Sequence, residues 1–127
     1  MEPQVWGPHG WFFLHSVTMA YPEKPTKKDK EDYFIFFNTL TKVLPCEVCR
    51  KHFKQHMAEI PIEPALQSRQ TLVEWLIKIH NLVRALYQLI YDISFLGINS
   101  LYLVNKTVGL SFQKILSRSF HETNNTM

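Results

Sequence analysis

Glycine is scarce in this chain, with four residues in 127, and turn signals of the β-hairpin kind are few. This scarcity argues against an all-β fold, whose strands are usually bounded by such turns. Dense runs of basic residues are also missing, because the lysines and arginines are scattered and leave a net charge of only +3. The charge pattern therefore gives no indication of a nucleic-acid partner.

Cysteine is equally scarce: the chain has two, Cys46 and Cys49, in the order Cys-Glu-Val-Cys. A small secreted domain held together by disulfides would need more cysteines, spread along its length. A bond across two intervening residues closes too short a loop to stabilise much, so the pair indicates chemistry instead of a staple. The start of the chain also lacks the features of a signal peptide, so we expect the protein to stay inside the cell that makes it.

Hydrophobic residues make up 46% of the chain and aromatic residues 13%, which is enough to bury a core. The length of 127 residues fits one domain with at most a terminal appendage. Apolar residues recur at spacings of three and four, which predicts helices, and prolines separate the helical segments. The first helix is predicted from Pro8 to Ala20. A second, capped by Thr26 or Asp29, is predicted to reach Val43.

Proline and serine mark the helices of the second half. A third helix is predicted over 45–58, because proline favours the first helical position. Pro61 and Pro64 then interrupt the chain, and Ser68 is a cap for a fourth helix that ends near Arg84. The predicted fold class is all-α: a four-helix bundle with an additional C-terminal helical segment.

Three ranges follow from this pattern: the bundle over 1–84, an apolar helical segment over 85–116 and a flexible tail over 117–127. Residues 85–104 have the length of a membrane-spanning helix, but polar residues interrupt them: Gln88, Asp92 and Asn99. Because these three are four and seven positions apart, they lie along one face, which predicts an amphipathic helix. We expect it to pack on the bundle, on a partner copy or in a membrane interface, with a membrane span as the alternative.

The two cysteines fall in the first turn of the predicted third helix. Free backbone N–H groups and the helix dipole stabilise a thiolate there, and Arg50 and Lys51 add positive charge nearby. A thiolate is the nucleophile in thiol–disulfide exchange, so the pair is a candidate redox centre. Two ordinary reduced cysteines are the alternative that the spacing alone leaves open.

Zinc is the competing interpretation of the same segment, because His52 and His56 follow the cysteines and both residue types bind zinc. Geometry counts against a closed site on one helix. Cys46 and His56 would lie about 15 Å apart along the axis, whereas zinc holds its ligands at about 2.0–2.3 Å. We therefore predict no metal site, and keep a small zinc-binding interaction module as an alternative.

A second group of candidate residues is aromatic and histidine-rich: Trp6, Trp11 and His15 in the first segment, and Trp75, His80 and Asn81 in the fourth. Each of these residues alone is explained by core packing. Together they supply aromatic walls and a few polar groups, which is what a buried flat cofactor needs. A cysteine pair that passes two electrons onward also needs a redox cofactor, because no side chain takes up a hydride equivalent.

At these residues the sequence resembles the Erv/ALR family of FAD-linked sulfhydryl oxidases. The resemblance covers residues 3–84, and its minimal form is similar to members encoded by large DNA viruses. Four stretches match in order and spacing: Trp6-Gly7-x-x-x-Trp11-x-x-x-His15, Tyr21-Pro22-x-x-Pro25-Thr26, Leu44-Pro45-Cys46-x-x-Cys49 followed by His52-Phe53, and Trp75-x-x-x-x-His80-Asn81-x-Val83.

The resemblance implies a four-helix bundle that holds FAD at its mouth and oxidises thiols to disulfides, with oxygen reduced to hydrogen peroxide. Cys49 would be the sulfur nearest the flavin and Cys46 the one that exchanges with substrate. The residues that match the family's cofactor contacts are Trp6, Gly7, Trp11, His15, His80, Asn81 and Val83. Homodimers are common among such proteins, and a viral member would act in the cytoplasm of a host cell or in a virion.

Two departures from the family pattern bear on function. The family usually has Asn at the position of Arg84, followed by a Gly-Lys-Pro turn that this chain lacks; Arg84 is a candidate for the missing positive charge. With two cysteines, the chain also has no second shuttle disulfide. Substrate thiols must then reach Cys46 directly or through a separate dithiol carrier. A bundle that keeps the fold but has lost flavin is the alternative that these departures suggest.

Overall fold

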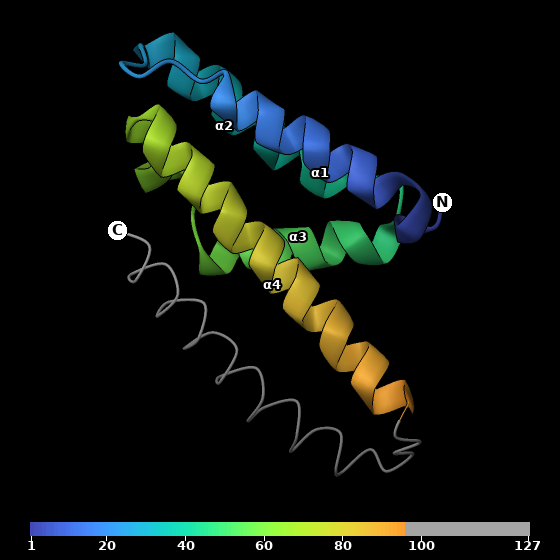
Figure 1. Ribbon diagram of the computed structural model, residues 1–127. Helices are drawn as coiled ribbons and strands as arrows, with labels where there is room; N and C mark the ends of the chain where they lie inside the picture. Colours follow the sequence, from blue (N-terminus) through green and yellow to red (C-terminus); the bar gives the residue numbers. More distant parts are fainter. Residues whose placement is uncertain (96–127) are drawn as a thin grey trace, which may run out of the picture. The chain divides into compact units, whose positions relative to one another are not determined.

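The structure is a computed structural model that describes residues 1–95 of the chain, with side chains described up to residue 90. Every regular element within that range is helical (Figure 1), which confirms the predicted all-α fold class. The elements are α1 (Pro3–Met19), α2 (Lys27–Val43), α3 (Glu47–Glu59), the 3₁₀ helix η1 (Glu63–Gln67) and α4 (Arg69–Phe95).

The first helix begins earlier than the sequence predicts. Pro3, not Pro8, occupies the start of α1, and Pro8 lies inside the helix. A proline in the first turn loses nothing, because the N–H it lacks has no intrahelical partner there. The prediction that the helix starts at Pro8 was therefore wrong. Pro8 lacks the N–H that would bond the carbonyl of Gln4, so its place inside the helix costs one helical hydrogen bond.

The second helix begins with a reciprocal cap. The Thr26 side chain accepts from the Asp29 backbone N–H at 3.1 Å, and the Asp29 carboxylate accepts from the Thr26 N–H at 2.8 Å. Hydrogen bonding from the Thr26 backbone N–H, and to a smaller extent from the Thr26 side chain, lowers the pKa of the Asp29 carboxyl below its ordinary value, because it favours the ionised carboxylate. Of the two caps that the sequence suggested, Thr26 is the N-cap.

The third and fourth helices are bounded by the residues around the predicted prolines. Cys46 has extended backbone angles, φ −156° and ψ 121°, and is the N-cap of α3, so the helix starts two residues later than predicted. Pro64 lies in η1. The Ser68 hydroxyl accepts from the Thr71 N–H at 3.2 Å, which confirms the predicted cap of α4. Beyond Arg84 the helix continues without a break to Phe95.

A single hydrophobic core lies in the unit Met1–His80. In this unit α1 and α2 run antiparallel (Figure 1). They lie side by side, because Phe13 packs edge-on against Phe36. Two polar side chains fix η1 and the end of α3: the Tyr21 hydroxyl donates to the Leu66 carbonyl, and Trp75 Nε1 donates to the Ile60 carbonyl, both at 2.8 Å. The buried apolar residues are Leu14, Tyr21, Phe37, Phe53, Ile62, Ala65, Leu66, Leu72, Trp75, Leu76 and Ile79.

The second unit begins at Asn81, inside α4. Among the residues that the structure describes, no helix is both long and apolar enough to cross a membrane. Gln88 is exposed. The other members of the predicted polar stripe, Asp92 and Asn99, lie outside the described side chains, as do the predicted tail 117–127 and most of the segment 85–116.

Candidate functional site

Cys46 and Cys49 form a disulfide at the start of α3, with their Cα atoms 5.2 Å apart. That separation is in the ordinary range for disulfides. The Cys49 backbone N–H also points at Cys46 Sγ, at 3.3 Å. A helix N-cap position of this kind stabilises negative charge, which favours the thiolate form of a cysteine placed there. The pair therefore has the geometry of an exchangeable redox disulfide.

The charges beside the disulfide are partly engaged. Arg50 Nη1 donates to the Leu44 carbonyl at 2.5 Å, which ties α3 to the segment that leads into Cys46. Lys51 pairs with Glu47 at 3.3 Å, and both side chains are exposed. An exposed pair of this kind contributes little energy and largely cancels its own charge. Arg50, which bonds a neutral carbonyl, therefore keeps its positive charge near the start of α3.

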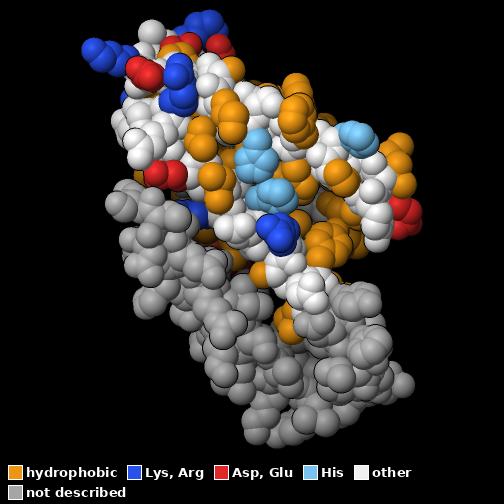
Figure 2. Space-filling model, in the orientation of Figure 1, with side chains coloured by type: hydrophobic (Ala, Val, Ile, Leu, Met, Phe, Trp, Pro, Cys, Tyr) orange, Lys and Arg blue, Asp and Glu red, His pale blue; other side chains and the backbone are white. Residues whose placement is uncertain are grey.

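Trp11, His15 and His80 meet between α1 and α4. His15 Nε2 and His80 Nδ1 lie 2.9 Å apart, within hydrogen-bond distance. The Trp11 and His80 rings stack, with centroids 4.0 Å apart and an interplanar angle of 10°. Burial lowers the pKa of His15, which favours its neutral ring. The structure thus brings together three of the residues that the sequence singled out. On the face of the molecule that Figure 2 shows, histidine side chains are bordered by hydrophobic ones.

Trp6 and Gly7, in the first turns of α1, show two features of an incomplete site. Trp6 is half-buried, and its Nε1 is fully buried without a hydrogen-bond partner among the described residues. A buried N–H group without a partner is costly, and it calls for an explanation such as a ligand. Gly7 is buried, yet a Cβ added there would meet no atom within 4 Å, so the space beside it is open. The residues present therefore fit a bound group at this end of α1.

Gly10 is a residue that the sequence reasoning missed. A Cβ at Gly10 would lie 3.1 Å from Trp6 Cε3 and 3.3 Å from Cζ3, tighter than ordinary van der Waals contact. The absence of a side chain there lets the indole of Trp6 lie against the helix. The signal was available, because a glycine inside a helix costs up to about 1 kcal/mol and needs a packing or functional reason.

The remaining predicted site residues follow on α4. Asn81 and Val83 are half-buried and Arg84 is exposed. All three belong to the unit that begins at Asn81, whereas the cysteines belong to the unit Met1–His80. Trp75 is buried, and its indole N–H is satisfied by the Ile60 carbonyl, so it serves the core. In the described part of the chain, no group of three or more potential metal ligands comes together.

The family model described as "Erv1 / Alr family" matches residues 8–94 of this chain. That range is more than half of the 127 residues and includes both cysteines and the His15–His80 pair. The chain belongs to the Erv1/Alr family. The resemblance inferred from four motifs is thereby confirmed.

Two relatives, one viral and one from a plant, support the same assignment. A protein of Acanthamoeba polyphaga mimivirus named "probable FAD-linked sulfhydryl oxidase" is 45% identical over 84 residues, which are 65% of this chain and 59% of that protein. The "FAD-linked sulfhydryl oxidase ERV1" of Arabidopsis thaliana is 35% identical over 82 residues, covering 64% of this chain and 42% of that protein. This chain therefore spans about half the length of these relatives.

Solved structures are similar to this chain in both fold and sequence. The FAD-binding domain of Erv1 from Saccharomyces cerevisiae matches with a TM-score of 0.65 and 32% identity, over 69% of this chain and 82% of that one. The yeast Erv1 core matches with the same TM-score and 31% identity, over 69% and 73% of the two chains. The similarity therefore covers most of the residues that the structure describes.

Proposed function

We propose that this protein is an FAD-dependent thiol oxidase that makes disulfides in protein or dithiol substrates. The observation that carries the proposal is the Cys46–Cys49 disulfide at the N-cap of α3, in a chain of the Erv1/Alr family. The names of the relatives, which are FAD-linked sulfhydryl oxidases, support the same activity.

In the proposed reaction, a substrate thiolate attacks one sulfur of the pair and forms a mixed disulfide. A second substrate thiol releases it, so the substrate gains one disulfide and the pair becomes two thiols. By family resemblance, Cys46 is the sulfur that exchanges with substrate and Cys49 is the sulfur nearer the cofactor. FAD, when bound, accepts the two electrons from the dithiol, and oxygen is the proposed final acceptor, giving hydrogen peroxide.

The proposed cofactor contacts lie on α1 and α4. Trp11 and His80 stack on each other, and His15 fixes the orientation of the His80 ring through their hydrogen bond. The unpartnered Trp6 Nε1 and the open space beside Gly7 offer room and a donor. The remaining contacts proposed by family resemblance are Asn81 and Val83, with Arg84 as a candidate charge for the phosphates.

Colour and turnover test this proposal together. The purified chain should be yellow from bound flavin and should oxidise dithiothreitol with consumption of oxygen. A yellow protein without turnover would support a flavin-binding bundle and would contradict the proposed oxidase activity. A colourless, well-folded protein that binds no added FAD would favour the inactive bundle that the departures around Arg84 suggest.

We also propose that a second copy of the chain is a partner. α1 carries exposed apolar side chains at heptad spacing: Val5, Phe12 and Met19 are 64%, 78% and 61% exposed. Residues seven apart lie on one helix face, and large exposed apolar faces mark interaction sites. Phe12→Glu should convert a dimer to a monomer in sedimentation experiments.

The intracellular or virion location stays a prediction from the sequence.

A further inference from the structure

Arg50 and the backbone of Cys46 bond the same oxygen atom. Leu44 is the C-cap of α2, and its carbonyl accepts from the Cys46 N–H at 2.8 Å and from Arg50 Nη1 at 2.5 Å. The first bond closes a three-residue turn centred on Pro45. The second joins that turn to the side chain four positions after Cys46. The Leu44 carbonyl therefore couples the placement of the Arg50 guanidinium to the placement of Cys46.

The turn is held at both of its ends. The Leu44 side chain packs against the hydrophobic core, and its N–H bonds the Leu40 carbonyl at 3.2 Å, which anchors the turn to α2. At the other end, the Cys46 carbonyl accepts from the Arg50 N–H at 3.0 Å, as the N-cap carbonyl of a helix does. Arg50 therefore bonds this segment twice, once through its backbone and once through its guanidinium.

The shared oxygen also places the Arg50 charge close to the Cys46 sulfur. Two hydrogen bonds, of 2.5 and 2.8 Å, connect Nη1 to the Cys46 nitrogen through that oxygen. A cysteine sulfur is three covalent bonds from its own nitrogen, so the charge and the sulfur lie within the distance of about 10 Å over which charges interact at 0.1 M salt. Arg50 is half-buried, so water and salt screen its charge less than that of an exposed side chain.

Other charged groups beside this turn are exposed: Lys42 in the last turn of α2, Glu47 and Lys51 in α3, and the Met1 amino group, which donates to the Pro45 carbonyl at 3.0 Å. Glu47 and Lys51 bond each other at 3.3 Å, so their charges largely cancel. His52 is half-buried, but a histidine is mostly neutral at physiological pH. Among these groups, Arg50 combines a permanent charge, partial burial and a bond to the turn that carries Cys46.

We propose that Arg50 is a positioning residue for Cys46, which fixes the turn before the sulfur and stabilises the thiolate that Cys46 becomes when substrate is released. The proposal rests on the proposed thiol exchange, and it adds a residue that acts on the exchanging sulfur without touching substrate or cofactor.

The thiolate in question forms in the second step of the exchange. In the first step a substrate thiolate attacks Cys46 Sγ, and Cys49 leaves with the electron pair of the broken disulfide. A second substrate thiolate then attacks the substrate sulfur of the mixed disulfide, forms the new disulfide and releases Cys46 as a thiolate. The substrate loses two electrons, and the cysteine pair gains them. A nearby positive charge speeds the release, because a less basic thiolate leaves faster.

Alkylation of Cys46 tests the proposal without any turnover. In the full chain with Cys49→Ser and bound FAD, Cys46 is the only cysteine, and iodoacetamide reacts with its thiolate form. Adding Arg50→Gln should slow the reaction about tenfold at pH 6.5, because the neutral side chain no longer stabilises the thiolate. At pH 10, where the thiol is ionised in either case, the two rates should agree within about twofold. Arg50→Lys keeps the charge and should restore most of the rate at pH 6.5.

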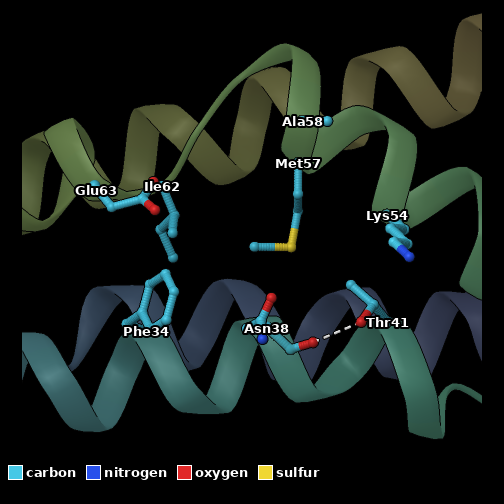
Figure 3. Close-up of a pocket in the computed structure, with 8 residues that line it drawn as sticks. All are labelled: Phe34, Asn38, Thr41, Lys54, Met57, Ala58, Ile62 and Glu63. Carbon is cyan, nitrogen blue, oxygen red and sulfur yellow. Dashed lines mark hydrogen bonds between the residues drawn. The ribbon is translucent and has the colours of Figure 1, made fainter.

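Lys54→Gln is the matched control. Lys54 is four positions after Arg50 on the same face of α3, and it lines the pocket between α2 and α3 that Figure 3 shows. At 1.5 Å per residue it lies about 12 Å from Cys46 along the helix axis, beyond the screening distance. The same change of charge at this position should therefore leave the rate at pH 6.5 within about twofold of the rate without it.

Three results would overturn the proposal. The first is an equal rate at pH 6.5 with and without Arg50→Gln. The second is an equal loss at pH 6.5 and pH 10, because access to the sulfur would then have changed instead of thiolate stability. The third is a loss in Lys54→Gln as large as that in Arg50→Gln. Arg50→Met, also neutral, replaces Arg50→Gln under the same criteria if circular dichroism shows that Arg50→Gln has lost its helices.

The proposed function is tested separately. Alkylation requires neither oxygen nor electron transfer to flavin, so its rates depend on the environment of Cys46 alone. A chain without Cys49→Ser that fails to oxidise dithiothreitol would contradict the oxidase activity, whereas the alkylation rates would still decide whether Arg50 stabilises the Cys46 thiolate.

Discussion

His15 and His80, 65 positions apart in the chain, lie with Nε2 and Nδ1 2.9 Å from each other. A neutral imidazole has one donor and one acceptor nitrogen, so one ring donates and the other accepts. The hydrogen bond therefore couples the tautomers of the two rings. Trp11 stacks on His80 at 4.0 Å, so the pair is also held in orientation from α1.

The first prediction concerns this aromatic cluster. His80→Ala and Trp11→Ala should each weaken FAD binding at least tenfold, because they remove one wall of the proposed cofactor site. A ligand that binds only the folded state stabilises it by about 2.7 kcal/mol at one hundred times its dissociation constant. The rise in melting temperature on adding FAD should therefore shrink in both variants. If both lose the same stability with and without FAD, they are core residues only.

The second prediction separates the cysteines from the cofactor. Cys46→Ser and Cys49→Ser should each abolish dithiothreitol oxidation, because exchange needs an attacking and a resolving sulfur. Both variants should stay yellow, since the proposed flavin contacts are aromatic and histidine side chains. Cys46→Ser should also show a long-wavelength charge-transfer absorbance from a Cys49 thiolate beside the flavin. A colourless but helical Cys49→Ser protein would contradict this division of roles.

The third prediction uses the two glycines of α1. Ala is favoured over Gly in a helix by up to about 1 kcal/mol, and a Cβ at Gly7 meets no atom within 4 Å. Gly7→Ala should therefore raise the stability of the FAD-free protein while it weakens FAD binding. Gly10→Ala should weaken FAD binding without that gain, because its Cβ displaces the Trp6 ring. Equal stabilisation of the Gly7→Ala variant with and without FAD would contradict a role of Gly7 in the cofactor site.

Much of this architecture could be predicted because it is local. Periodicity and prolines gave four helices, the Thr26 cap follows from its own turn, and the first-turn position of Cys49 follows from Pro45. The His15–His80 contact could not be predicted from periodicity, which assigns residues to faces but does not say which faces meet. The family resemblance grouped these residues as cofactor contacts, and only the structure shows that they bond to each other.

His56 was not predicted as a core residue, because the sequence analysis considered it only as a ligand in the zinc alternative. It lies in the core with 2% of its surface exposed, and neither ring nitrogen has a hydrogen-bond partner among the described residues. Burial, with a smaller contribution from His52, lowers the pKa of His56 from 6.5 to about 4. Between pH 6.5 and about 4, the ring is therefore neutral in the folded protein and protonated in the unfolded chain.

The last prediction follows from that difference in proton binding. Between pH 6.5 and about 4 the unfolded state binds more protons at His56, so the free energy of unfolding should fall as the pH falls through this window. The loss is at most about 3.5 kcal/mol, at roughly 1.4 kcal/mol per pKa unit. His56→Leu should be more stable near pH 5 and should lose most of this acid sensitivity, measured by urea unfolding at pH 7 and pH 5. His52→Gln is the control, because His52 is only half-buried and should leave the dependence largely in place. An unchanged pH dependence in His56→Leu would show that other groups cause the acid sensitivity.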